Sequence, residues 1–201
     1  MQPGGSEEVL EFWFGALDAN GRADEEHTRR WFEKNEAFDE QIRERFGEVH
    51  AAAARGERDA WLGTTRGRLA LVIVLDQFSR NLFRGDAKSF ACDERAFAAA
   101  SEAVALGIDR TLALDERCFL YLPFMHSERL EHQKRCVELY RALLEEQPVE
   151  LRSYIDNSLR FAKRHQVIVE RFGRFPHRNA ALGRSSTPEE IEFLKQPGSG
   201  F

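Results

Sequence analysis

The sequence predicts an all-α protein made of antiparallel helix pairs, arranged as a bundle or as a tetratricopeptide-like helical solenoid. Apolar residues recur at helical spacing through nearly the whole chain, for example at Trp31, Phe38, Ile42 and Phe46. Glycine, proline and helix-capping residues divide the chain into segments of helix length. The sequence shows no convincing 34-residue period, so any structural repeats would have diverged.

Three helices are expected at the start of the chain. Ser6 is placed to cap a short helix, because the acidic Glu7 that follows it suits a helix N-terminus. A second helix is expected over 24–46, where the aromatic spacing is regular. A third helix, rich in alanine, is expected over 48–55 and should end at Gly56.

The central element is expected over 68–83. Its first half, 69–75, is apolar on all sides, which is typical of a helix in the middle of a fold. A buried strand is the alternative, because short apolar runs are ambiguous. We favour a helix because Asp76, Arg80 and Arg84 continue the segment at intervals of four residues.

Two capped helices should follow the central one. Asp86 can cap a helix over 87–106, and Asp115 can cap the next. That second helix meets Pro123 after about two turns. Proline lacks the N–H that would bond to the preceding turn, so we expect a kink or a break there.

The last third of the chain contains three further predicted helices. The first covers 127–146 and the second covers 151–172. The third begins at Thr187, which forms a capping box with Glu190 and is followed by Pro188 in the first helical position.

Composition indicates one globular domain over residues 1–201, with flexible tails at 1–5 and 196–201. The chain is 42% hydrophobic and 31% charged, and it carries 29 basic and 34 acidic residues for a net charge of −5. We expect a cytoplasmic protein, because no segment reads as a signal peptide or a membrane span and the three cysteines are widely spaced. The negative charge argues against binding to nucleic acid.

The first segment with polar residues in an apolar setting is 75–84. Asp76 and Arg80 share one helix face, and Gln77 and Asn81 form a parallel row. Buried polar side chains need partners, since each unsatisfied group costs about 1–3 kcal/mol. The segment is therefore either an internal lock between helices or part of a functional site.

The second segment is 122–128. Pro123 frees a backbone carbonyl near the point where His126 leaves the helix, so His126 either satisfies a buried group or has a functional role. Glu128 and His132 are one turn apart, but a third metal ligand is missing. We expect no metal site and no cofactor.

The third segment is the basic stretch 160–184, which holds seven Arg or Lys residues and one acid. His165 lies on the predicted inward face of its helix. Gly173 and Pro176 predict a turn after that helix. A solvated helix end would account for the earlier basic residues, but the residues 177–179 lie beyond the helix and suit an anion site better.

Five segments in order resemble the domain-of-unknown-function family 924. They are 9–15, 75–81, 122–128, 172–179 and 182–187, and the resemblance extends over nearly the whole chain. The resemblance implies an all-helical, tetratricopeptide-like fold. It implies no particular activity.

The leading hypothesis is a binding module for a small anionic ligand or an acidic peptide. The three polar segments would converge between helices into one pocket lined by arginine and histidine. The expected ligand-binding residues are Arg80, Asn81, Arg84, Ser127, Arg174, His177, Arg178 and Asn179.

Two other functions stay open. The protein could be a hydrolase or transferase acting on an anionic substrate, with a histidine as base and a carboxylate as its orienting partner; the candidates are His126, His165, Glu128 and Asp76. Alternatively, the polar segments form a purely structural network and the surface binds a protein partner. Nucleic-acid binding would require Lys163, Arg164, Arg171 and Arg178 on one exposed face.

Overall fold

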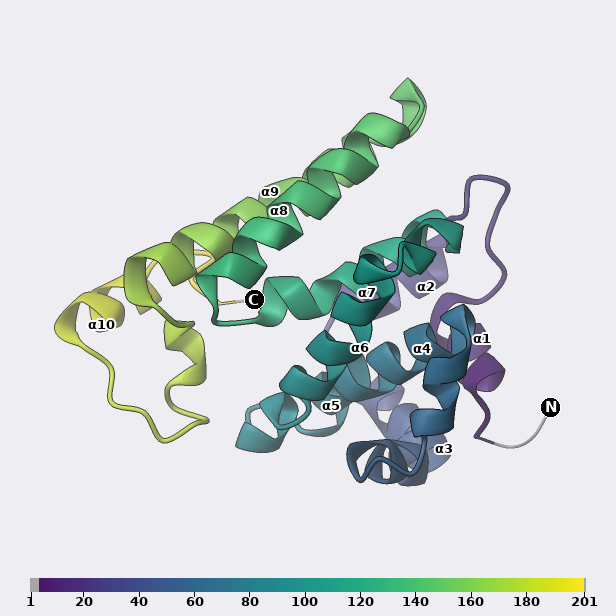
Figure 1. The fold of residues 1–201 in the computed structure, drawn as a ribbon. Coiled ribbons are helices and arrows are strands. Elements are labelled where there is room, and N and C mark those ends of the chain that lie inside the picture. The colour runs from purple at the N-terminus through teal and green to yellow at the C-terminus, as the bar shows by residue number, and fades with distance from the viewer. Residues whose placement is uncertain (1–3, 201) are drawn as a thin grey trace. The chain divides into compact units, whose positions relative to one another are not determined.

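The computed structural model describes residues 4–200, and every regular element in that range is helical (Figure 1). The predicted all-α class is confirmed, whereas the tetratricopeptide-like arrangement stays a prediction. Residues 1–3 and 201 of the predicted flexible tails lie outside the described residues. In the second tail, Ser199 is buried and its hydroxyl donates to the Leu194 carbonyl.

The chain separates into two compact units. Unit 1 extends to Arg84 and resumes over Lys88–Pro123, and unit 2 comprises Gly85–Ala87 and the chain from Phe124 onward. The single domain expected over 1–201 stays a prediction.

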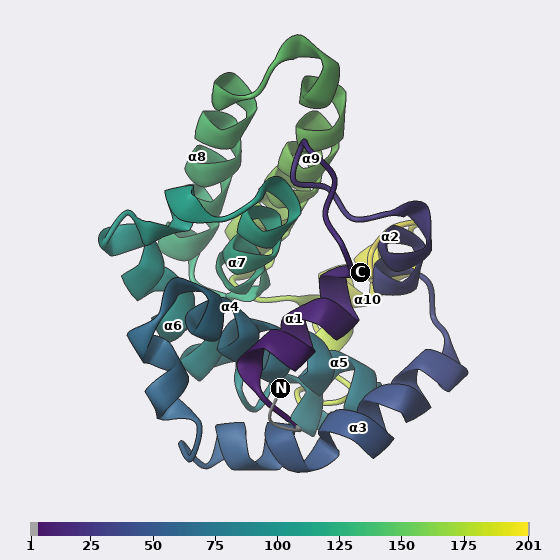
Figure 2. The same ribbon diagram turned by 90° about the vertical axis from the view of Figure 1, so that its right-hand side faces the viewer.

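Unit 1 is organised around a continuous helical rod. The rod consists of α4 (Thr65–Val72), a π-helical segment (Ile73–Phe78) and α5 (Ser79–Leu82). Its apolar half is at most 2% exposed, and α1 and α6 both pack against α4 (Figure 2). The prediction of a buried helix rather than a strand is confirmed. The other helices of unit 1 are α1 (Ser6–Phe14), α2 (Glu25–Phe32), α3 (Glu36–Ala54), α6 (Asp93–Ala105) and most of α7 (Leu114–His126).

Short 3-10 turns connect these helices at Asp59–Gly63, Ala87–Phe90 and Ile108–Thr111.

The core of unit 1 is aromatic. The Phe12 ring lies 5.0 Å from that of Phe46, and Trp13 meets Phe119 edge to face at 5.6 Å. These ring pairs pack α1 against α3 and against α7.

Several predicted boundaries in unit 1 are wrong. The helix expected over 24–46 is interrupted, because the Asn35 side chain accepts from the Phe38 N–H and starts α3. The separate helix expected over 48–55 does not exist, since α3 continues through Gly47 to Ala54. Ser6 is the first residue of α1 rather than its cap.

Two predicted caps are also misplaced. The helix expected from residue 87 begins at Asp93, after the 3-10 turn. Asp115 lies inside α7, where its carboxylate accepts from the Ala23 N–H at 2.8 Å, so a long-range contact replaces the predicted cap. Of the kink or break predicted at Pro123, the break is wrong, because α7 continues to His126, and the kink stays a prediction.

Unit 2 is built on an antiparallel helix hairpin. Its arms are α8 (Leu130–Glu146) and α9 (Val149–Phe172), which lie side by side in Figures 1 and 2. A 3-10 turn (Pro176–Arg178) and α10 (Pro188–Leu194) follow. Ile168, Val169 and Phe175 form a buried core with Leu130, Phe172 and Phe193 packed around it.

Two predicted helix boundaries in unit 2 are confirmed, the end of α9 and the start of α10. Gly173 ends α9 with a φ of 68°, a backbone conformation that favours glycine. Thr187 and Glu190 form the reciprocal capping box at the start of α10. The predicted start at residue 127 is wrong, since α8 begins at Leu130. No helix among residues 4–200 is long and apolar enough to span a bilayer.

Candidate functional site

The segment 75–84 forms a buried ion-pair network in unit 1. Asp76 is 1% exposed, and Arg80 contacts it at 3.0 Å, so the predicted pair is confirmed. Arg80 also donates to both carboxylate oxygens of Asp93, at 3.0 and 3.2 Å. Burial opposes the charged form of Arg80, but Asp76 and Asp93 outweigh it and raise its pKa.

Asp39 is a partner that the sequence analysis missed. Its carboxylate accepts from Asn81 at 2.7 Å and from two nitrogens of Arg84 at 2.5 and 2.9 Å, which ties α5 to α3. The available signal was an acid beside Phe38 on an otherwise apolar helix face. Both Asn81 and Arg84 therefore contact a carboxylate of the chain itself.

A second missed pair lies deeper in unit 1. The His50 Nε2 is 2.8 Å from the Ser79 hydroxyl, which donates to the Leu75 carbonyl at 2.6 Å. Because that carbonyl takes the hydroxyl proton, His50 is the donor to the Ser79 oxygen. Burial lowers the pKa of His50. Because the Ser79 hydroxyl donates to the Leu75 carbonyl rather than to His50, and because Ser79 is fully buried, the geometry does not match an activated nucleophile.

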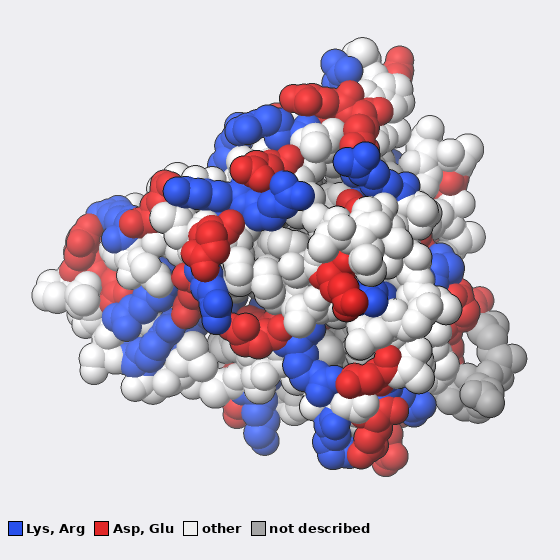
Figure 3. All heavy atoms as spheres, viewed as in Figure 1, with Lys and Arg blue, Asp and Glu red and all other residues white. Residues whose placement is uncertain are grey.

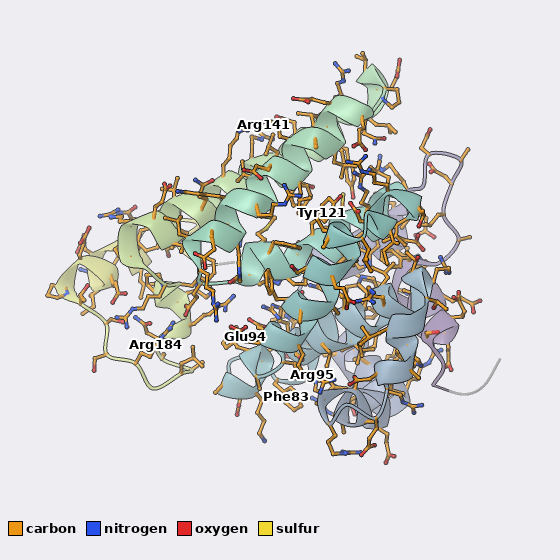
Figure 4. All side chains as sticks on the ribbon, viewed as in Figure 1. Phe83, Glu94, Arg95, Tyr121, Arg141 and Arg184 are labelled. Atoms are coloured by element: carbon orange, nitrogen blue, oxygen red, sulfur yellow. The ribbon has the colours of Figure 1, made fainter. Side chains whose placement is uncertain are left out.

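Glu128 in unit 2 is held by Arg184, which comes from the loop between α9 and α10 (Figure 4). Its carboxylate accepts from two nitrogens of Arg184 at 2.7 and 2.9 Å and from the Phe175 N–H at 2.8 Å. Burial raises the pKa of Glu128, but Arg184 and the Phe175 N–H outweigh burial and the net pKa is lowered. Arg184 carried no predicted role.

Glu190 pairs with Arg174 in the same way that Glu128 pairs with Arg184. It accepts from two nitrogens of Arg174, at 2.7 and 2.8 Å. The Asn179 amide contacts both Glu190, at 3.3 Å, and the Ser186 hydroxyl, at 3.0 Å. The bond from Arg174 is the main reason that the pKa of Glu190 falls to about 2.

Three basic side chains, those of His165, His177 and Arg178, gather around the ring of Phe175, and together with His126, which lies near His165, we call them the basic cluster. Arg178 lies over the Phe175 ring at 4.7 Å, and the rings of His165 and His177 lie 5.5 and 5.6 Å from it. His126 and His165 are 6.5 Å apart. These residues come from the end of α7, from α9 and from the 3-10 turn.

His165 is buried on the inward face of α9, as predicted. Burial is the largest cause that lowers its pKa to about 3, and His126, Arg178 and His177 lower it further. Its Nδ1 lies 2.8 Å from the Phe161 carbonyl, so Nδ1 carries the proton of the neutral ring and Nε2 is an acceptor. A base with so low a pKa is weak, which reduces the support for an enzyme that uses His165.

Ser127 completes the turn after α7. Its hydroxyl lies 2.8 Å from His132 and accepts from the Arg129 N–H at 3.2 Å. Within residues 4–200, no group of three or more metal-ligating side chains is close enough to hold a metal ion.

The structure does not meet the condition set for nucleic-acid binding, which was a single exposed face with four basic side chains. Arg178 is 6% exposed, so it does not share an exposed face with Lys163, Arg164 and Arg171. On the face drawn in Figure 3, basic side chains lie interspersed with acidic ones.

A hollow of about 460 Å³ lies in unit 1, and none of the predicted site residues lines it. It is lined by α1, Arg66 and Glu116 among others. Arg66 already pairs with Glu7 and Glu116, and the apolar Leu10 and Phe14 are each 1% exposed. The hollow therefore offers little surface to a ligand.

The structure thus brings the predicted residues together within each unit. In unit 1, Asp76 and Arg80 meet, while Asn81 and Arg84 share Asp39. In unit 2, the basic cluster forms beside Ser127, Glu128, Arg174 and Asn179. Convergence of all three segments in one pocket stays a prediction.

The chain matches, over residues 9–198, the family described as "Bacterial protein of unknown function (DUF924)". It is also similar to the solved structure of ATU0120, a protein of unknown function from Agrobacterium tumefaciens. The two chains share 39% identity with a TM-score of 0.79, over 94% of this chain and 96% of the other. None of the curated proteins matches the chain. The order of the motifs, the helical fold and these matches agree, and the chain belongs to the DUF924 family.

Proposed function

We propose that unit 2 binds a small oxyanion, such as phosphate or the carboxylate of an acidic peptide end, at the basic cluster. The observation that carries the proposal is the gathering of His165, His177 and Arg178 around the Phe175 ring, with His126 6.5 Å from His165. His126, His177 and Arg178 disfavour a further positive charge on His165 and lower its pKa. An anion placed among them would relieve that repulsion. Arg178 is buried, where electrostatic attraction is stronger than in water.

The members of the cluster would play different roles. Arg178 would supply a permanent charge, because guanidinium stays protonated at all physiological pH values. His126 and His177 would donate hydrogen bonds. His165 stays neutral, so it would orient the ligand rather than attract it. Ser127 and Asn179 lie on the adjoining turns and would complete the ring of polar contacts.

Three predicted anion contacts receive less support. Arg80 faces Asp76 and Asp93, Arg84 faces Asp39, and Arg174 faces Glu190. A ligand would have to compete with a carboxylate that is already in place. We therefore centre the proposed site on Arg178.

The test is a titration of wild-type protein and three variants with inorganic phosphate at low ionic strength, followed by calorimetry and by the melting temperature. Binding at the cluster predicts that Arg178→Ala and His177→Ala abolish the heat and the thermal stabilisation. Arg171→Ala is the matched control, because Arg171 is exposed and pairs with Glu189 on the surface. Equal phosphate stabilisation in all four proteins would refute the proposal.

A further arm separates the two sources of an oxyanion. An acidic peptide with a free C-terminus is compared with the same peptide carrying a C-terminal amide. Preference for the free acid over phosphate identifies a peptide end, and preference for phosphate identifies a small ligand. Circular dichroism spectra of each variant check that folding is retained.

A scaffold for a protein partner is the second candidate function. The pairing of arginines with the chain's own carboxylates in both units favours it, because such networks often have a purely structural role. The scaffold function would be favoured if no anion binds to the wild type and if Arg178→Ala is less stable than the wild type. The cytoplasmic location is also a proposal, supported by three buried cysteines that are all free thiols.

A further inference from the structure

The turn that ends α7 presents four backbone carbonyls in a row, at residues 124–127. The last carbonyls of any α-helix lack partners within the helix, so each needs a donor from elsewhere. Here the carbonyls that need donors lie in a buried region, because Phe124 and Met125 are 3% and 4% exposed. Unsatisfied carbonyls in such a place would destabilise the turn.

Side chains supply the donors to the Met125, His126 and Ser127 carbonyls, and the Phe124 carbonyl also contacts the Ser127 N–H at 3.4 Å. The Gln133 amide nitrogen lies 3.3 Å from the Phe124 carbonyl and 2.6 Å from those of Met125 and Ser127. Arg178 takes the remaining carbonyl, that of His126, at 2.9 Å. Gln133 comes from the first turn of α8 and is fully buried.

The turn held in this way also carries members of the proposed site. His126 projects from it, Ser127 follows directly, and Arg178 is anchored on the carbonyl of His126. We propose that Gln133 is a positioning residue: by bonding to the Met125 and Ser127 carbonyls on either side of His126, it aims the His126 carbonyl at Arg178 and sets the position of both basic groups. The part of this inference that concerns a ligand rests on the proposed function.

Glutamine suits this position for a specific reason. An amide nitrogen has two N–H groups, one for the Met125 carbonyl and one for the Ser127 carbonyl, whereas a carboxylate of the same size would only accept. Methionine has a similar length and no donor, so Gln133→Met removes the hydrogen bonds while largely filling the space. Val137, one turn further along α8 and 6% exposed, provides the matched control as Val137→Ala, which removes apolar packing only.

The experiment compares wild type, Gln133→Met and Val137→Ala under conditions where each is fully folded. The first readout is the NMR signal of the Arg178 side-chain Nε–H, which needs no ligand. The second is the affinity for inorganic phosphate. Positioning predicts that Gln133→Met shifts the Arg178 signal and weakens phosphate binding by about tenfold, while Val137→Ala changes neither.

Each outcome decides one of the two claims. If phosphate binds wild type and Gln133→Met equally well, or if the Arg178 signal is the same in both, the positioning role is overturned. If phosphate does not bind wild type, the proposed function fails, and the Arg178 signal alone decides the role of Gln133. A shift of that signal in Val137→Ala as large as in Gln133→Met would reduce Gln133 to a structural residue.

Discussion

Replacing Glu190 by alanine should destabilise unit 2 more than any exposed substitution on α10. Glu190 is 2% exposed and accepts from Arg174 twice, from Asn179, and from the Thr187 N–H at 2.8 Å. Loss of one partner of a buried ion pair costs about 3–5 kcal/mol. Arg174 keeps contact with water because its side chain is 27% exposed, so we take the lower end, about 3 kcal/mol.

The matched control is Glu189→Ala, one residue earlier. Glu189 pairs with Arg171, but both side chains are largely exposed, at 62% and 48%. Exposed pairs contribute about 0–1 kcal/mol, so this variant should stay close to wild type. The two substitutions remove the same charge from the same helix and differ in burial.

Urea unfolding followed by two probes can locate the effect. Circular dichroism reports helices in both units, whereas all three tryptophans lie in unit 1 and their fluorescence reports only that unit. A loss of about 3 kcal/mol lowers the circular dichroism midpoint by about 2 M if the slope is about 1.5 kcal/mol per M. A Glu190→Ala midpoint indistinguishable from that of Glu189→Ala would refute the ion-pair reasoning.

The same variant gives a signed dependence on pH. The bond from Arg174 lowers the pKa of Glu190 from its ordinary value of 4.5 to about 2. The unfolded chain therefore takes up a proton first, so the stabilisation is complete above pH 4.5 and is lost as the pH falls towards 2. The stability difference between wild type and Glu190→Ala should shrink over that window, and a constant difference would contradict the assignment.

Three further outcomes follow from the structure. Gly67→Ala should destabilise unit 1, since an added Cβ would overlap the Trp61 carbonyl, whereas Gly47→Ala in open space inside α3 should stabilise it by about 0.5–1 kcal/mol in urea unfolding. The His165 ring should show no NMR titration above pH 5, and because its folded pKa of about 3 lies below its ordinary 6.5, its burial should reduce stability as the pH falls between those values. The three buried thiols, whose pKa values burial raises, should react with a disulfide reagent at pH 8 only after urea unfolding.

The fold could be predicted where local signals decide the structure. The capping box at Thr187 and the left-handed end at Gly173 each depend on a few neighbouring residues, and both were predictable. The boundaries around α3 were not. Gly47 lies inside the helix because packing of Phe46 and Val49 outweighs the low helix propensity of one glycine. Asn35 starts α3 through an N-cap that the aromatic spacing concealed.

The candidate site divides in the same way. The pair Asp76 and Arg80 lies one helical turn apart, so its contact follows from sequence spacing alone. The contact between Glu128 and Arg184 joins residues 56 positions apart, and no local rule identifies it. The role of Gln133 was hidden for a related reason, because a glutamine that serves carbonyls of another helix has no sequence signature.

These long-range pairs change the meaning of the basic stretch. A run of arginines in sequence suggests a single positive surface, but Arg174 and Arg184 are each held by a carboxylate in the structure. What they contribute is rigidity: two ion pairs and the capping box fix the loop between α9 and α10 on either side of Arg178. Arg178 itself is directed by the Phe175 ring and the His126 carbonyl, beside three histidines. A site that must bind an anion selectively needs its donors fixed beforehand, and the paired arginines supply that fixed frame for the cluster they surround.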